Sequence, residues 1–117
     1  KVLLSELPKV ILDAILDRLD FKPFTRYTII RRSEFLDELE KCRQLGYALD
    51  ARESQEEGFC IAAPVRSKDG EVIAALSFSG IIGGIRDSEI TYYEQLLKKA
   101  AIEISDNLFK LESEKTE

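Results

Sequence analysis

Four polar side chains in the middle of the sequence could together bind a small polar molecule. They are Asp50, Cys60, Ser77 and Ser79. A serine hydroxyl can donate a hydrogen bond to a carboxylate or keto oxygen, an ionised aspartate can only accept, and a thiol is a weak donor. The chemistry that these groups favour is therefore binding of a ligand that carries carboxylate, keto or hydroxyl groups, rather than turnover.

Two apolar runs, Phe59–Arg66 and Val72–Ser79, must position three of these residues. Asp69-Gly70 lies between the runs, and Asp-Gly between two apolar runs predicts a β-hairpin. If Asp69-Gly70 is a two-residue turn, Lys68 faces Glu71, and this pairing fixes the register of the whole hairpin.

The predicted register sets Ala62 opposite Ser77 and Cys60 opposite Ser79. Because side chains alternate along a strand, the hairpin has one bulky apolar face and one face of mostly small residues. The small-residue face leaves space for a ligand. It is equally compatible with a thin sheet edge or with a closely packed helix. The apolar face carries Phe59, Ile61, Ala63, Val65, Val72, Ala74, Leu76 and Phe78. The small-residue face carries Cys60, Ala62, Pro64, Ile73, Ala75, Ser77 and Ser79.

Helical spacing and capping residues predict helices on both sides of this hairpin. Ser33 is the predicted N-cap of a helix that ends at Gly46, and Asp87 is the predicted cap of a last helix of about 25 residues. Further expected elements are a helix end at Lys1–Leu7, a helix from Pro8 through Leu19, an extended piece at Tyr27–Ile30, a strand at Tyr47–Asp50, a charged loop at Ala51–Glu57, a flexible connection at Gly80–Gly84 and a fraying tail at Glu112–Glu117. The stripe of the last helix is Ile90, Tyr93, Leu97, Ala100, Ile104, Leu108 and Leu111.

Composition excludes several classes of function. The chain has 117 residues, which fits one domain, and a net charge of −5 with no basic cluster beyond Arg31-Arg32, which disfavours direct binding of nucleic acid. It contains no histidine, so Ser-His-Asp and Cys-His systems and the usual zinc sites are excluded. We expect no metal and no cofactor. We also expect no membrane span, because no apolar run approaches ~20 residues. Cys42 and Cys60 show no CxxC spacing, which indicates a reducing, cytoplasmic compartment.

The order of features resembles the ligand-sensing domain of IclR-type transcriptional regulators over nearly the whole chain. The residues that carry the resemblance are Leu36–Leu39, Gly46–Asp50, Glu53, Cys60–Val65, Asp69-Gly70, Ala74–Gly80, Lys99–Ala101, Glu103-Ile104 and Ser105. The resemblance departs from the family pattern at Arg52, which stands in place of an acid, at Gly58, which lies two rather than three residues before the cysteine, and at Ile81, where proline is common.

The resemblance implies an α/β (α+β) domain of GAF-like fold, in which an antiparallel sheet is flanked by helices and the first strands precede Lys1. It implies a C-terminal effector-binding domain over residues 1–117, with the DNA-binding winged helix-turn-helix domain absent from this chain. The implied partners are a small organic-acid effector and further copies of the chain, as a homodimer or tetramer. Ile81, Ile82 and Ile85 in the glycine-rich loop are the expected contact surface.

The family's ligand-contacting positions carry over onto the four residues that the hairpin register already groups, Asp50, Cys60, Ser77 and Ser79. Two alternatives remain open. The chain could be a structural or dimerisation domain with a vestigial pocket. It could also be an enzyme with Cys60 as nucleophile and Asp50 as base, although the thiol lacks an evident activator. We therefore expect no enzymatic activity.

Overall fold

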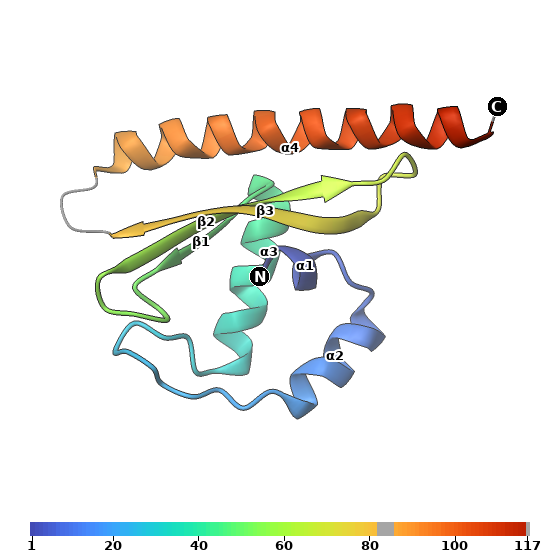
Figure 1. Cartoon of the computed structure of the whole chain (residues 1–117). Coiled ribbons are helices and arrows are strands. Elements are labelled where there is room, and N and C mark those ends of the chain that lie inside the picture. The colour runs from blue at the N-terminus through green and yellow to red at the C-terminus, as the bar shows by residue number, and fades with distance from the viewer. Residues whose placement is uncertain (82–85, 117) are drawn as a thin grey trace.

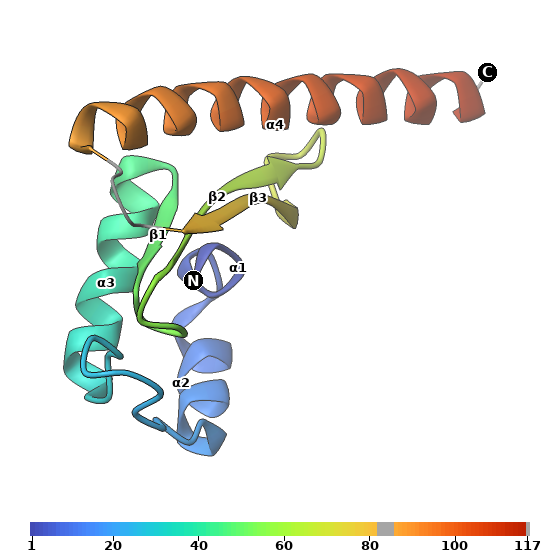
Figure 2. The same cartoon turned by 60° about the vertical axis from the view of Figure 1, so that its left-hand side comes forward.

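The computed structural model describes residues 1–81 and 86–116, which form three layers around a small antiparallel sheet (Figure 1). Helix α4 covers one face of the sheet, while α1 and α3 lie on the other (Figure 2). The strand order is β1-β2-β3. The elements are α1 (Val2–Ser5), α2 (Lys9–Arg18), α3 (Arg32–Leu45), β1 (Ala48–Ala51), β2 (Gly58–Arg66), β3 (Val72–Ile81) and α4 (Asp87–Thr116). The α+β class and the antiparallel sheet flanked by helices confirm the expected fold class.

The β2–β3 hairpin has the predicted register but not the predicted turn. Ala62 pairs with Ser77 and Cys60 with Ser79, as expected. The turn, however, has three residues, because the Ser67 N–H donates to the Glu71 carbonyl at 2.8 Å and Gly70 adopts a left-handed φ of 85°. A bulge in β3 next to the Val65/Arg66 pairs then removes the one-residue offset, as is common after such turns.

The bulge moves Val72 to the face opposite the one that we predicted. Val72 pairs with Arg66 and packs with Ala62 against a small cluster of buried residues, Val2, Cys42 and Ala48. Helices α1 and α3 supply the first two of these residues. The small-residue face therefore does accommodate closely packed helices over part of its area, which was one of the open alternatives.

The main core lies between the other face of the sheet and α4. Its buried members are Phe59, Ile61, Ala63, Val65, Leu97 and Ala101. Strand β2 contributes every second residue, as strand alternation requires, whereas β3 is largely exposed. Burying these side chains is the main favourable term for this layer, at about 25 cal/mol per Å² of apolar surface.

The buried stripe of α4 is rotated slightly from the predicted one. Ala101 and Ser105 are buried, whereas Ala100 lies at the margin and Ile104 is exposed. The spacing of four from Leu97 to Ala101 and Ser105 keeps one helix face toward β2. The helix has 30 residues and continues through 112–116, so the predicted fraying tail is wrong.

Local signals located the other helices to within one or two residues. Pro8 is the N-cap of α2, and Gly46 ends α3 with a φ of 77°. The predicted Ser33 N-cap is wrong: α3 begins at Arg32 after Arg31, and Ser33 lies inside its first turn. Strand β1 begins one residue later than predicted, at Ala48.

Two further expectations concern chain segments without helix. The stretch Tyr27–Ile30 forms no strand, although it is rich in β-forming residues. Gly80 is part of β3 rather than of a flexible connection, and it pairs with Phe59.

Of the apolar loop residues, Ile81 ends β3 with 71% of its surface exposed, while Ile82 and Ile85 lie outside the described residues. Within the described ranges, no helix has the length and apolarity needed to cross a bilayer.

Candidate functional site

Three of the four predicted site residues lie side by side on neighbouring strands. Asp50 of β1 pairs with Cys60 of β2, which pairs with Ser79 of β3. Ser77 lies two residues before Ser79, so its side chain shares the same face. This is the face opposite α4. The predicted grouping of these four residues on one face of the sheet is confirmed by the register.

A hollow of about 240 Å³ opens on this face beside the N-terminal residues. It is lined by Lys1, Val2, Ala48, Leu49, Asp50, Glu53, Cys60 and Ala62. Two of the predicted residues, Asp50 and Cys60, thus line one cavity. Ser77 and Ser79 are exposed on the adjacent strand and are not among the lining residues.

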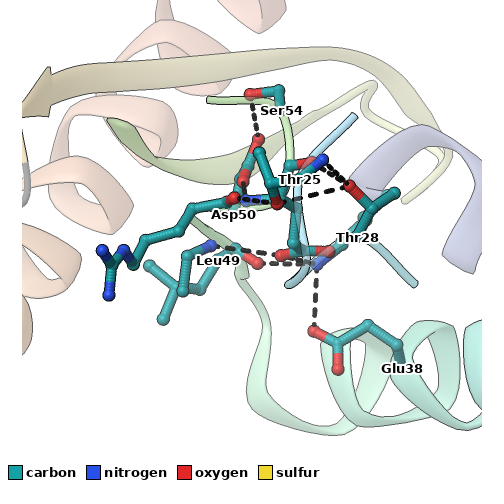
Figure 3. A network of polar contacts seen from close by, with 10 residues as sticks. Thr25, Thr28, Glu38, Leu49, Asp50 and Ser54 are labelled. Carbon is teal, nitrogen blue, oxygen red and sulfur yellow. Dashed lines mark hydrogen bonds and ion pairs between the residues drawn. The ribbon is translucent and has the colours of Figure 1, made fainter. Parts of the chain in front are cut away.

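The carboxylate of Asp50 is already occupied by the loop that follows β1. Its Oδ1 accepts the Glu53 N–H at 2.9 Å, and its Oδ2 accepts the Ser54 hydroxyl at 3.0 Å (Figure 3). An aspartate that bonds backbone donors a few residues onward is a common way to fix a turn. Asp50 therefore shapes the rim of the hollow by orienting Glu53.

Glu53 connects this turn to Lys1, an interaction that sequence reasoning missed. Its Oε2 accepts the Ala51 N–H at 3.1 Å and the Lys1 ammonium at 2.7 Å. The same Lys1 Nζ donates to the Leu49 carbonyl at 2.7 Å and to Glu38 of α3 at 3.3 Å. Figure 3 shows Glu38 reaching from its helix toward this network. The three protons of the ammonium thus have three acceptors.

Side chains of the segment before α3 form hydrogen bonds with the loop that follows β1. The Thr25 hydroxyl donates to the Arg52 carbonyl at 2.6 Å, and the Thr28 hydroxyl donates to the Glu53 carbonyl at 2.5 Å (Figure 3). The Arg52 guanidinium lies 4.5 Å from the centre of the Tyr27 ring and donates to its hydroxyl at 2.9 Å. Arg52 has a φ of 64°, a left-handed conformation that few non-glycine residues adopt. These contacts explain why Tyr27–Ile30 is fixed without joining the sheet.

The hollow has binding groups but no activated nucleophile. Cys60 Sγ lies 3.9 Å from the Ile61 carbonyl, a weak contact at most, and the sequence contains no histidine that could take its proton. Burial raises the pKa of the other thiol, Cys42, and the nearby Glu38 acts in the same direction. Cys42 is therefore held as the thiol. In the described part of the chain, no three candidate ligands are grouped so that they could hold a metal ion.

Comparison with known proteins relates this chain to one family of regulators. The family described as "Bacterial transcriptional regulator IclR C-terminal" matches residues 1–106. The HTH-type transcriptional regulator XynR of Escherichia coli K12 is 33% identical over 105 residues, which cover 90% of this chain and 42% of XynR. This chain therefore spans about two fifths of the length of that regulator.

Solved structures agree with this family match. The crystal structure of the C-terminal domain of the E. coli transcriptional regulator KdgR has a TM-score of 0.87 at 32% identity, covering 92% of this chain and 66% of that one. The inducer-binding domain of the PobR transcription factor from Acinetobacter, a double mutant in complex with 3-hydroxybenzoic acid, has a TM-score of 0.83 at 30% identity, covering 89% and 60%.

Proposed function

This chain belongs to the IclR family of bacterial transcriptional regulators as their C-terminal effector-binding domain, and we propose that it senses a small organic acid in the hollow beside Asp50 and Cys60. The family is one of regulators, not of enzymes. The single observation that carries the proposed site is the alignment of Asp50, Cys60 and Ser79 across three strands, at the edge of a cavity. The complex of the PobR domain with 3-hydroxybenzoic acid supports this class of ligand.

The groups around the hollow favour a ligand with both acidic and hydroxyl or keto oxygens. The exposed hydroxyls of Ser77 and Ser79 are free to turn toward a carboxylate or keto oxygen. The opposite rim carries Asp50 and Glu53, whose carboxylates can accept only from a ligand hydroxyl. A hydroxy acid or keto acid oriented across the sheet, with its acidic end toward β3, satisfies both sides.

The effect of such a ligand on transcription requires parts beyond this domain. We propose that DNA is bound by a separate winged helix-turn-helix domain on the N-terminal side, and that the regulator acts in the cytoplasm as a homodimer or tetramer. The helix-turn-helix designation of XynR and the exposure of Ile81 support these proposals. A ligand changes DNA binding only if it favours one subunit arrangement over another. Light scattering at high micromolar concentration tests the oligomer: a monomer would count against it.

The ligand site is tested by calorimetry after a thermal-shift screen of hydroxy and keto acids. With a compound found in this way, Ser79→Ala is expected to weaken binding about tenfold or more if the hydroxyl meets a carboxylate, because such bonds contribute about 1.5–3 kcal/mol. Asp50→Asn is also expected to weaken binding, but indirectly, because it loosens the turn that orients Glu53. Ser33→Ala, which removes an exposed hydroxyl on α3, is the matched control. Unchanged affinity in both Ser79→Ala and Asp50→Asn would place the ligand elsewhere.

A further inference from the structure

A larger groove lies on the other side of the domain, between the middle of α4 and the end of β2. Its volume is about 490 Å³, within the range of sites for small molecules. Strand β1 pairs with β2 only as far as Ala62, so no strand of residues 1–81 and 86–116 covers the edge of β2 beyond that residue. The groove is bounded by this edge, by the hairpin turn and by α4.

The charges lining this groove are all positive. Arg66, Lys68 and Lys98 line it, and no acidic side chain among the described ones does, in a chain whose net charge is −5. Arg66 pairs with Glu6 at 2.7 Å, and Lys98 pairs with Glu94 at 2.9 Å. Lys68 forms no ion pair with the rest of residues 1–81 and 86–116. Its ammonium is thus the group with the most capacity to meet an anion.

A buried hydroxyl in the same wall lacks a hydrogen-bond partner. Ser67 Oγ is inaccessible to solvent, and within the described residues nothing accepts from it or donates to it. Buried polar atoms are nearly always paired, by protein groups or by water, so this hydroxyl has hydrogen-bonding capacity that the described residues do not use. The neighbouring Arg66 N–H is satisfied by Ser105 Oγ at 3.0 Å, so the unpaired polar atom of this wall is the Ser67 hydroxyl, which a ligand reaches only after the Ser67 side chain turns toward the groove.

The remaining wall is apolar and comes from α4. Ala101 is buried at its base, whereas Ile102 is 62% exposed beside it. A hydrophobic surface next to a cation and a free hydroxyl matches an amphipathic anion. The hollow on the opposite face differs, because its lining has one cation, Lys1, against two acids, Asp50 and Glu53. The lining of the groove is therefore more positive than that of the hollow.

We propose that this groove is a second ligand site, which takes a monocarboxylate with a small aromatic or aliphatic body. The carboxylate meets the Lys68 ammonium, and it accepts from the Ser67 hydroxyl once that side chain has turned toward the groove, while the apolar body lies against Ala101 and Ile102. This site is separate from the effector hollow, and a compound bound there would act on the domain through α4 and the β2–β3 turn.

The test is an NMR titration of the isotope-labelled chain with benzoate as the probe and benzamide as its neutral match. Benzoate is expected to shift the backbone amides of Ser67, Lys68 and Ile102, with benzamide shifting them far less. The attraction between the carboxylate and the Lys68 ammonium is electrostatic and open to solvent. Raising the salt concentration from about 0.05 M to about 0.5 M is therefore expected to weaken benzoate binding. Shifts confined to Asp50 and Cys60 would overturn the second site and would instead report on the hollow.

Variants separate a specific site from general attraction to lysines. Lys68→Gln is expected to weaken benzoate binding about two- to fivefold, as for a solvent-exposed ion pair. Ser67→Ala is expected to weaken it about tenfold or more, since hydrogen bonds to charged groups are the stronger class. Lys99→Gln, an exposed lysine next to Lys98 on the same helix, is the control and is expected to leave binding unchanged.

Three results would refute the proposal. Equal weakening by Lys68→Gln and Lys99→Gln would mean non-specific attraction, and equal binding of benzamide would remove the role of charge. Full affinity in a folded Ser67→Ala variant would show that the hydroxyl does not contact the ligand. The thermal unfolding midpoint of each variant, which we expect to stay within a few degrees of the parent, verifies that it folds.

Discussion

The close contact between Gly80 and the ring of Phe59 makes a sharp prediction about stability. The two residues pair across β3 and β2, and a Cβ added at Gly80 would lie 2.6 Å from Phe59 Cε1 and 3.0 Å from its Cζ. Real Cβ atoms do not approach so closely, and Phe59 as a residue is 95% buried, so its ring has little room to move. The backbone itself would accept alanine, because Gly80 is not among the residues with positive φ.

The expected cost of Gly80→Ala follows from two opposing effects. Overpacking of a core costs about 1–3 kcal/mol, whereas replacing glycine by alanine in a strand contributes roughly 0.5–1 kcal/mol in the other direction. The steric effect is larger, so the variant should lose about 0.5–2 kcal/mol of unfolding free energy in urea. Gly58→Ala is the control, since its Cβ would meet only Gln55 at an ordinary 3.4 Å. We expect Gly58→Ala to be neutral or slightly stabilising.

A double-mutant cycle then tests the cause. In the Phe59→Leu background the ring is absent, so adding Gly80→Ala should cost less than it does in the parent chain. The difference is a coupling energy, expected between about 0.5 and 3 kcal/mol for residues in contact. An equal cost in both backgrounds would refute the steric explanation, and a stabilising Gly80→Ala would show that the ring gives way freely.

Two further predictions concern residues on the two sides of the sheet. Ser105→Ala removes the acceptor of the Arg66 N–H and is expected to lower the free energy of unfolding in urea by about 1–3 kcal/mol. The control Asn107→Ala, an exposed change on the same helix, should lower it little, and equal stability of the two variants would contradict this. Cys42 is buried and its pKa is raised, so iodoacetamide at pH 8 should label it far more slowly than Cys60 in the native chain. Both thiols should react fully in denaturant. Equal native labelling rates, measured by mass spectrometry, would contradict the burial of Cys42.

The strand register illustrates what local sequence signals can establish. The pairing of Cys60 with Ser79 was predictable because alternation of apolar residues fixes which faces meet. The two-residue turn was wrong, and the register survived only because the bulge opposite Arg66 offsets the three-residue turn. Val72 lies beyond that bulge, nearer the turn, and its predicted face was therefore reversed.

The rim of the site was much less predictable. Lys1 contacts Glu53 across 52 residues and Glu38 across 37, and no local pattern in the sequence encodes such a contact. Thr28 belongs to the predicted extended segment Tyr27–Ile30, yet its hydroxyl and that of nearby Thr25 bind the loop after β1 rather than a strand. Side-chain hydrogen bonding competes with strand pairing, and tertiary context decides between them.

The position of Asp50 explains how one residue can matter to a ligand without touching it. Each of its carboxylate oxygens accepts one hydrogen bond from the protein, one from the Glu53 N–H and one from the Ser54 hydroxyl. A ligand that bonded Asp50 directly would have to share these oxygens with the two donors, because each oxygen has only one further lone-pair direction to offer. An intact turn instead holds the Glu53 carboxylate against Lys1, which partly balances the negative charge of the rim. Asp50 thus acts on the site by fixing where Glu53 and Lys1 lie, and the exposed hydroxyls of β3 remain as the groups available to an acidic ligand.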